Sequence, residues 1–320
     1  MVLANIRQAL NIRWNDLASE LAGQPHLDLA GFLNETGLEL DDLYRGSRGG
    51  WAALRREVGL DPRPVVSAEQ DSGLRKTISR LLHIDDPERL QFLRELLTQP
   101  SPPSLLEADL RHRLLLSMLN TAFDSRQPSR AVEGHLAKLW ANPARHEELL
   151  EVAEILRGRI NRLTPVVEEI VHLPLRLHAR YSRGEALAAF GMEVSGSMVA
   201  GVQWLPDQQA DVFLVTISKN ERQFSPTTMY NDRAISRTRF QWESQGRTRE
   251  QSATGQRYIN HETLGSTVHL FLRETKEDAY NYAGPMSYVE HEGERPMRIV
   301  WELAHPLPAD VFHYAKVTTG

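Results

Sequence analysis

Arginine and aromatic residues are interleaved in one stretch of the sequence, residues 219–245 (KNERQFSPTTMYNDRAISRTRFQWESQ). A buried strand does not carry an arginine every few positions, because charged side chains are almost never fully buried unless they are paired. Guanidinium groups bind phosphate oxygens with two parallel hydrogen bonds, and aromatic rings stack on nucleobases. The stretch therefore indicates contact with nucleic acid. The alternative is an ordinary half-buried strand with one solvated face.

The last part of this stretch, residues 237–244, alternates with the period of a β-strand. Successive side chains of a strand point to opposite faces, so Arg239 and Gln241 share one face and Phe240 and Trp242 share the other. Phe240 and Trp242 could line a binding site. They could also be core residues, because large aromatic side chains are usually well buried.

Charge is distributed unevenly along the chain. The net charge is −5, yet residues 221–260 hold seven arginines and four acidic residues. A local basic face on an acidic chain is compatible with docking onto a polyanion at one place only. A solvated surface would show the same composition.

The overall composition, 41% hydrophobic and 25% charged residues, is that of a soluble globular protein. The absence of cysteine excludes disulfides, thiolate zinc sites and cysteine nucleophiles. The first 21 residues carry charges throughout and predict an amphipathic helix rather than a signal peptide. No apolar run is long enough to span a membrane. We therefore expect a cytoplasmic protein that does not contact membranes.

Apolar residues recur at helical spacing through most of residues 2–160, and the period changes to two after Pro174. Ser182 and Glu185 match a capping box that opens one further helix. The sequence then predicts strands at 202–205, 212–217, 235–242, 267–272, 286–289 and 297–303. The predicted fold is α+β: an N-terminal all-α domain, residues 1–177, and a β-rich domain, residues 178–320, with a strongly bent sheet or small barrel.

Motifs for catalysis are absent from the sequence. It contains no P-loop, no G-x-G-x-x-G after a strand, no G-x-S-x-G, no H-E-x-x-H and no H-x-K. A metal-dependent nuclease would need an aspartate and a Glu-x-Lys triplet on neighbouring strands. Asp211 begins a strand, but Glu274-Thr-Lys276 follows more than sixty residues later. We predict no catalytic residues, no metal site and no cofactor, with the nuclease as the least favoured alternative.

Four segments resemble a known family: VFLVTISKNERQFSPTTMYNDRAISRTRFQWESQ, TGQRYINH, LFLRE and GERPMRIVWEL, within residues 212–303. They look like the domain of unknown function at the C-terminus of certain bacterial superfamily II (DEAD/DEAH) helicases. Some of those proteins are modification-dependent type IV restriction enzymes of the SauUSI type. In these enzymes a nuclease and a helicase precede a helical coupler and a recognition domain. Residues 1–177 resemble the coupler more loosely.

The resemblance implies an SRA/PUA-like recognition domain that reads modified cytosine (5-methylcytosine or 5-hydroxymethylcytosine) by base flipping, in a phage-defence restriction system. It implies duplex DNA as ligand and helicase and nuclease domains or subunits as partners, and it is compatible with a homodimer. The nuclease and helicase are not in this sequence, so the resemblance implies no catalytic activity for it. The alternative is a protein-interaction adaptor whose arginine-aromatic face binds an acidic helicase or nuclease partner.

Base flipping costs a few kcal/mol, and stacking on an aromatic ring returns about 1–3 kcal/mol per base. The candidates for the base pocket are Tyr230, Asn231, Asp232, Phe240, Trp242, Ser244, Gln245 and Tyr258. The candidates for contact with the DNA backbone are Lys219, Arg233, Arg237, Arg239, Arg247 and Arg257. Asp232 could instead cap a turn, a common role for aspartate between strands.

Overall fold

The computed structural model describes residues 14–44, 48–65, 67–104, 108–123, 131–193, 201–218 and 232–316. The chain divides into two compact units. The helical unit comprises Met1–Leu82, Pro87–Glu107 and Arg130–Ile160, and the sheet unit comprises His83–Asp86, Ala108–Ser129 and Asn161–Gly320. The sheet unit thus takes in segments that the sequence assigned to the helical domain 1–177. Whether residues 178–320 fold alone stays a prediction.

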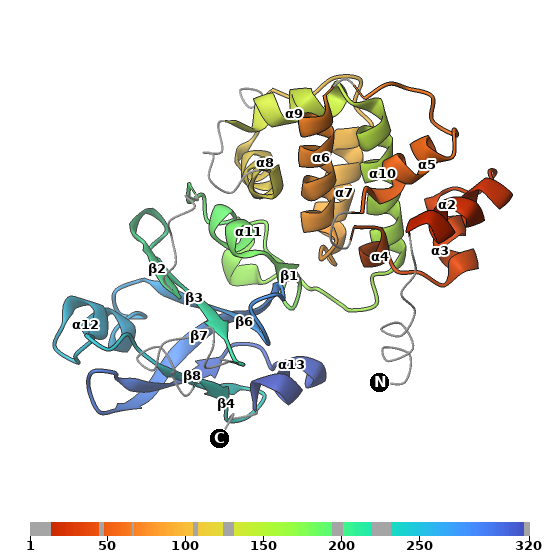
Figure 1. Cartoon of the computed structure of the whole chain (residues 1–320). Helices are drawn as coiled ribbons and strands as arrows, with labels where there is room; N and C mark the ends of the chain where they lie inside the picture. Colours follow the sequence, from red (N-terminus) through yellow and green to blue (C-terminus); the bar gives the residue numbers. More distant parts are fainter. Residues whose placement is uncertain are drawn as a thin grey trace. The chain divides into compact units, whose positions relative to one another are not determined.

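The helical unit is arranged around one long helix, α10 (Pro143–Gly158) (Figure 1). Asn142 caps α10 by accepting a hydrogen bond from the Arg145 N–H, and Pro143 takes the first helical position, where no N–H is required. Helices α3, α5, α6, α7 and α9 all contact α10. The other helices of this unit are α2 (Trp14–Gly23), α3 (Leu29–Thr36), α4 (Leu40–Tyr44), α5 (Gly50–Glu57), α6 (Ala68–Leu81), α7 (Pro87–Leu97) and α9 (Val132–Trp140).

A buried ionic network connects α10 to α4 and α6. The Arg145 side chain is 1% exposed, and it donates to Asp71 from Nε at 3.0 Å and from Nη2 at 2.6 Å. Its Nη1 donates to Glu148 at 2.7 Å, and Glu148 also accepts the Tyr44 hydroxyl at 2.8 Å. Burial opposes ionisation of Asp71, but hydrogen bonds from Arg145 keep the pKa of this carboxyl below its usual value. Arg145 thus contacts two carboxylates, and Arg56 lies 3.7 Å from Asp71 as a second cation.

We predict that Arg145→Ala destabilises the protein by about 3–5 kcal/mol, because it removes the cation that Glu148 pairs with and the two hydrogen bonds to Asp71. Urea unfolding measures this loss. Arg157→Ala, on the same helix, is the matched control: Arg157 is half exposed and pairs with Glu154 on the surface. Its loss should cost at most about 1 kcal/mol. Equal losses for the two variants would contradict a special role of the buried network.

The sheet unit contains one mixed sheet with the strand order β2-β3-β6-β7-β8-β5-β4, and β1 pairs with β7. Strands β3 and β6 are parallel and the other pairs are antiparallel. The strands are β1 (Arg180–Tyr181), β2 (Val202–Leu205), β3 (Ala210–Thr216), β4 (Arg233–Ala234), β5 (Arg239–Glu243), β6 (Thr267–Arg273), β7 (Tyr280–Glu292) and β8 (Arg298–Leu303). The helices are α8 (Leu110–Phe123), α11 (Arg183–Ala188), α12 (Ala253–Ile259) and α13 (Ala309–Ala315). The predicted α+β class is confirmed. The sheet is not closed, so the barrel alternative is wrong.

Two strand predictions differ from the structure. The predicted strand 235–242 is a hairpin, in which β4 and β5 are joined by residues 235–238 and the Ile235 N–H donates to the Arg239 carbonyl. The predicted strand 286–289 is only part of β7, which has 13 residues. Its first half contains Gly284 and Pro285, which the sequence pattern treats as turn residues. Gly284 has φ +94°, a conformation that favours glycine, and a register shift in the β6–β7 pairing lies beside it.

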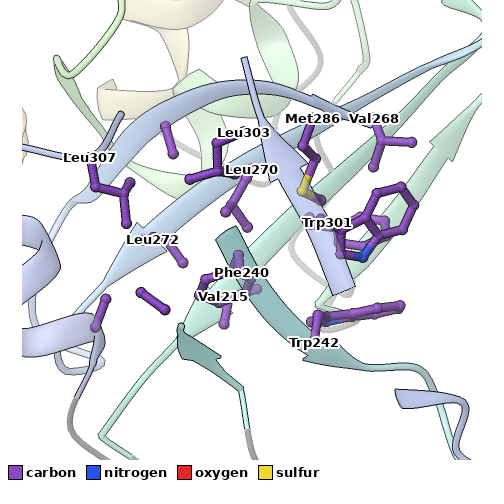
Figure 2. Close-up of a cluster of buried hydrophobic side chains, with 14 of the residues drawn as sticks. Val215, Phe240, Trp242, Val268, Leu270, Leu272, Met286, Trp301, Leu303 and Leu307 are labelled. Atoms are coloured by element: carbon purple, nitrogen blue, oxygen red, sulfur yellow. The ribbon is translucent and has the colours of Figure 1, made fainter. Parts of the chain in front are cut away.

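Aromatic rings on strands that are distant in the sheet order meet in the core of the sheet unit. Figure 2 shows two of these residues, Trp242 and Trp301, among the buried side chains. The ring centroids of Phe213 on β3 and Trp242 on β5 are 4.2 Å apart, and those of Phe213 and Trp301 on β8 are 5.6 Å apart. Four strand spacings separate β3 from β5, which is about 19 Å in a flat sheet. The sheet must therefore be strongly bent, as predicted, with these rings on its inner face.

His269 on β6 is a buried titratable group with both ring nitrogens occupied. It lies 2.9 Å from the Tyr282 hydroxyl through Nδ1 and 3.0 Å from Thr267 Oγ1 through Nε2. Burial lowers the pKa of His269 to about 3. In the unfolded chain a histidine takes up its proton near pH ~6.5. The stability that comes from this group is thus fully present above that pH and is lost as the pH falls toward 3.

We predict that the free energy of unfolding falls with decreasing pH below about 6, with about 1.4 kcal/mol per pH unit from His269. His269→Gln keeps groups that can bond to Tyr282 and Thr267 but does not titrate. Its slope between about pH 6 and about pH 4 should be smaller by that one-proton amount. Denaturant titrations at a series of pH values measure both slopes, and identical slopes would exclude His269 as the titrating group.

Candidate nucleic-acid interface

The strand directions divide the polar residues of the sheet unit between two ends of the sheet. At one end β3, β4, β6 and β8 begin and β2, β5 and β7 finish. Because α12 connects β5 to β6 there, we call it the α12 end. At the opposite end, the hairpin end, β4 turns into β5. Side chains at the two ends are separated by the length of a strand, so they cannot act together.

Three exposed arginines meet at the α12 end, in the loop that follows β5 and in the turn between β7 and β8. The backbone N–H of Arg295 donates to the Thr248 carbonyl at 3.1 Å, which places Arg295 beside Arg247 and Arg249. Within the described part of the chain, no acidic side chain pairs with any of the three guanidinium groups. We call Arg247, Arg249 and Arg295 the arginine cluster. The two segments that carry it, residues 244–250 and 293–298, hold four arginines and two glutamates.

Of the predicted backbone contacts, Arg233 and Arg247 lie at the α12 end. Arg233 is half exposed on β4, and it has no acidic partner among the described residues. The sequence did not single out Arg249 or Arg295 as contacts. Arg295 is recognisable only in three dimensions, because the bond to Thr248 joins segments more than forty residues apart.

The remaining predicted backbone contacts do not join this group. Arg239 pairs with Glu302 at 2.8 Å, and Arg237 donates from Nε to the Leu307 carbonyl at 2.6 Å, both toward the hairpin end. Arg257 is bound to Asp211. Lys219 lies outside the described residues. The predicted basic stretch is thus split, because β5 runs from one end of the sheet to the other.

The aromatic residues predicted for the base pocket lie in the hydrophobic core. Phe240 is 0% exposed, Trp242 is 4% exposed and Tyr258 is 2% exposed. A base needs a free ring face for stacking, and neighbouring core side chains cover these rings (Figure 2). In this conformation the core alternative describes Phe240 and Trp242, and Tyr258 lies in the same core. Contact of these rings with a base stays a prediction. The period-two pattern separated Phe240 and Trp242 from Arg239, but it could not distinguish a pocket from a core.

The polar base-pocket candidates are largely structural. Asp232 accepts the Glu243 N–H at 2.9 Å and so fixes the start of β4 against the end of β5. Ser244 is 0% exposed, and its Oγ accepts the Met297 N–H at 2.9 Å. Gln245 is exposed in the loop of the arginine cluster. Tyr230 and Asn231 lie outside the described residues.

Sequence reasoning missed a second feature of the α12 end, a stack of Arg257 on Trp204. The Arg257 guanidinium carbon lies 4.1 Å from the centre of the Trp204 ring. Arg257 donates to both carboxylate oxygens of Asp211, at 2.7 and 3.0 Å, and Asp211 is 0% exposed. Burial raises the pKa of Asp211, and the two hydrogen bonds from Arg257 oppose this rise. Nothing in the sequence indicated that Trp204, in a short predicted strand, would contact Arg257.

The acidic pair required by the nuclease alternative does not form. The parallel register of β3 and β6 sets Asp211 opposite Val268, six residues before Glu274. Six residues of strand span about 20 Å, too far for two carboxylates to share an ion. The described residues contain no group of three or more histidine, aspartate and glutamate side chains that could hold a metal. Among the helices in the described ranges, none has the length and apolar character to cross a membrane.

We predict that Trp242→Ala lowers the free energy of unfolding by about 3–5 kcal/mol, as expected for a truncated core aromatic. At a temperature where the variant is fully folded, its DNA affinity should equal that of the parent. Urea unfolding and a DNA titration on the same sample measure the two quantities. Gln245→Ala, in the exposed loop, is the stability control. A Trp242→Ala protein with parental stability and weaker DNA binding would return this residue to the pocket.

Comparison with known proteins agrees with the extent of the sheet. No curated protein matches the chain. Residues 175–315 match the family described as Domain of unknown function (DUF3427). The match begins just before β1 and ends with α13, so it includes every strand of the sheet. The helical unit lies outside it. The part of the chain that forms the sheet is therefore similar to this domain of unknown function.

Proposed function

We propose that this chain is a DNA-binding module in which the arginine cluster contacts phosphate groups. The observation that supports the proposal is the convergence of Arg247, Arg249 and Arg295 at one end of the sheet without acidic partners in the described structure. Each guanidinium presents donors in a fork that matches the oxygens of a phosphate. Neutralisation of phosphates by such groups releases counterions and provides most of the sequence-independent affinity for DNA.

Several other exposed arginines have acidic partners, which the three arginines of the cluster lack among the described residues. Arg239 pairs with Glu302, Arg180 pairs with Asp85, and Arg298 lies within 3.5 Å of carboxylates on both neighbouring strands. On a chain with a net charge of −5, acidic side chains are abundant. Like charges that stay together without such partners repel one another, and a bound polyanion relieves this repulsion.

The proposal extends to the ligand and the partners. The resemblance to modification-dependent restriction enzymes favours duplex DNA with a modified cytosine, and it favours helicase and nuclease domains or subunits as partners. No catalytic step is assigned to this chain. Burial of one methyl group contributes only about 0.8 kcal/mol, or about fourfold in affinity. Discrimination between methylated and plain cytosine should therefore be modest unless the unmodified base is penalised.

A second candidate is an adaptor that binds an acidic protein. Glu250 and Glu294 lie within the same loops, and the Glu250 N–H donates to a Glu294 carboxylate oxygen at 3.0 Å. Mixed charge of this kind suits a protein surface better than a uniform polyanion. Arginine binds a carboxylate in the same bidentate geometry as a phosphate, so the cluster could serve either ligand.

We predict that Arg247→Ala, Arg249→Ala and Arg295→Ala each weaken binding to plain and modified duplexes by similar factors. Each should reduce the slope of log affinity against log salt by about one. Fluorescence anisotropy with matched plain, 5-methylcytosine and 5-hydroxymethylcytosine duplexes at several salt concentrations measures both effects. Arg239→Ala is the matched control, because Glu302 already neutralises this exposed arginine.

Three outcomes separate the proposals. DNA binding is supported if the affinity for DNA falls steeply with salt in the parent and less steeply in the cluster variants. A parent protein that binds no duplex at low salt, yet binds an acidic polypeptide through the same arginines, supports the adaptor. A preference for a modified duplex that survives every cluster substitution locates the base-reading residues elsewhere in the chain.

A further inference from the structure

We propose that Trp204 stacks on an unpaired nucleobase, so that the ligand of the α12 end is DNA with a single-stranded or extruded nucleotide. This inference rests on the proposed DNA-binding function and assigns it a stacking residue. The stacking residue is then not Phe240 or Trp242, whose rings are buried, but a residue of a strand at the edge of the sheet.

Trp204 has a partly exposed ring. It is half-buried on β2, which pairs only with β3 among the described strands. The Arg257 guanidinium covers one face of its ring at 4.1 Å. Within the described residues the Trp204 ring contacts no other aromatic ring. This distinguishes it from Trp242 and Trp301, which pack against other aromatic rings in the core.

The orientation of Trp204 is held by a buried charge. In the β2–β3 register Trp204 lies directly opposite Asp211, and Arg257 bonds to both oxygens of that carboxylate. The three residues come from β2, β3 and α12, so each fixes the position of the next. A ring that is already held in place loses little conformational entropy when a base binds. The stacking face is therefore pre-organised.

The position of Trp204 near phosphate-binding groups favours a nucleotide as the occupant. Trp204 lies at the α12 end, as the arginine cluster does. Arg249 is tied to the start of α12, because the Ser252 hydroxyl donates to its carbonyl at 2.7 Å. From Ser252 to Arg257 the helix rises only about 8 Å. A short length of one DNA strand could thus place its phosphates on the cluster and one base on Trp204.

The test compares three DNAs at fixed salt: a fully paired duplex, the same duplex with one bulged thymidine, and single-stranded oligothymidylate. The parent should bind the bulged and single-stranded DNAs more tightly than the paired duplex. Trp204→Ala should lose about 5- to 100-fold in affinity for these two, the range expected for one stacked base. Its affinity for the paired duplex should stay within about twofold, because the phosphate contacts remain.

Further variants separate stacking from folding. Trp204→Phe keeps a ring and should retain most of the preference, whereas Trp204→Leu keeps apolar volume without a ring and should lose it. Trp140→Ala is the control, a half-buried tryptophan of the helical unit. Thermal unfolding identifies any variant that fails to fold, and Trp204→Leu replaces Trp204→Ala in that case.

Two results would overturn the inference alone: a parent that binds paired and bulged duplexes equally, or Ala and Leu variants that keep the parental preference for unpaired DNA. Salt-dependent binding of the paired duplex would still support the proposed function in either case. A parent that binds none of the three DNAs would overturn both proposals.

Discussion

The sheet unit depends on the burial of four aromatic rings on the inner face of one bent sheet. Phe213, Trp242, Tyr258 and Trp301 lie in edge and tilted contacts with centroids 4.2–6.3 Å apart. Rings from β3, β5 and β8 can meet only if the sheet curves through the strands between them. Each ring removes a large apolar area from water, and their mutual packing adds about 0.5–1.5 kcal/mol per pair. The core therefore uses the aromatic side chains that would otherwise be available to a ligand.

Because the inner face of the sheet is filled by core side chains, the direction of each strand decides which polar residues lie close enough to act together. Residues that are close in sequence, such as Arg237 and Arg247, lie at opposite ends of the sheet because β5 runs between them. Residues that are distant in sequence, such as Thr248 and Arg295, are brought into hydrogen-bond contact by the antiparallel pairing of β5, β8 and β7. A basic stretch in a strand is thus divided by folding, whereas a basic end of a sheet is assembled from several loops.

These constraints explain what the sequence could and could not predict. The α+β class and most strands follow from period, because a change from helical spacing to alternation is a local property. The β4–β5 hairpin was missed because its turn, Ile235 to Thr238, has the β-branched composition of a strand and lacks glycine. The partners of arginines were not predictable, since Glu302 and Asp211 reach Arg239 and Arg257 only through cross-strand register and helix packing. The arrangement of Trp204 depends on the same non-local contacts.

The ion pair between Asp211 and Arg257 determines what the Asp211 carboxylate can bind. An aspartate at the start of a strand is a reasonable metal ligand by sequence, but here both carboxylate oxygens accept hydrogen bonds from Arg257. Both oxygens of this carboxylate are occupied and Glu274 is about 20 Å away, so these two acids cannot share an ion. The same bonds fix the guanidinium over the indole of Trp204. The ion pair that occupies the carboxylate of Asp211 is therefore also the interaction that holds Arg257 against the Trp204 ring.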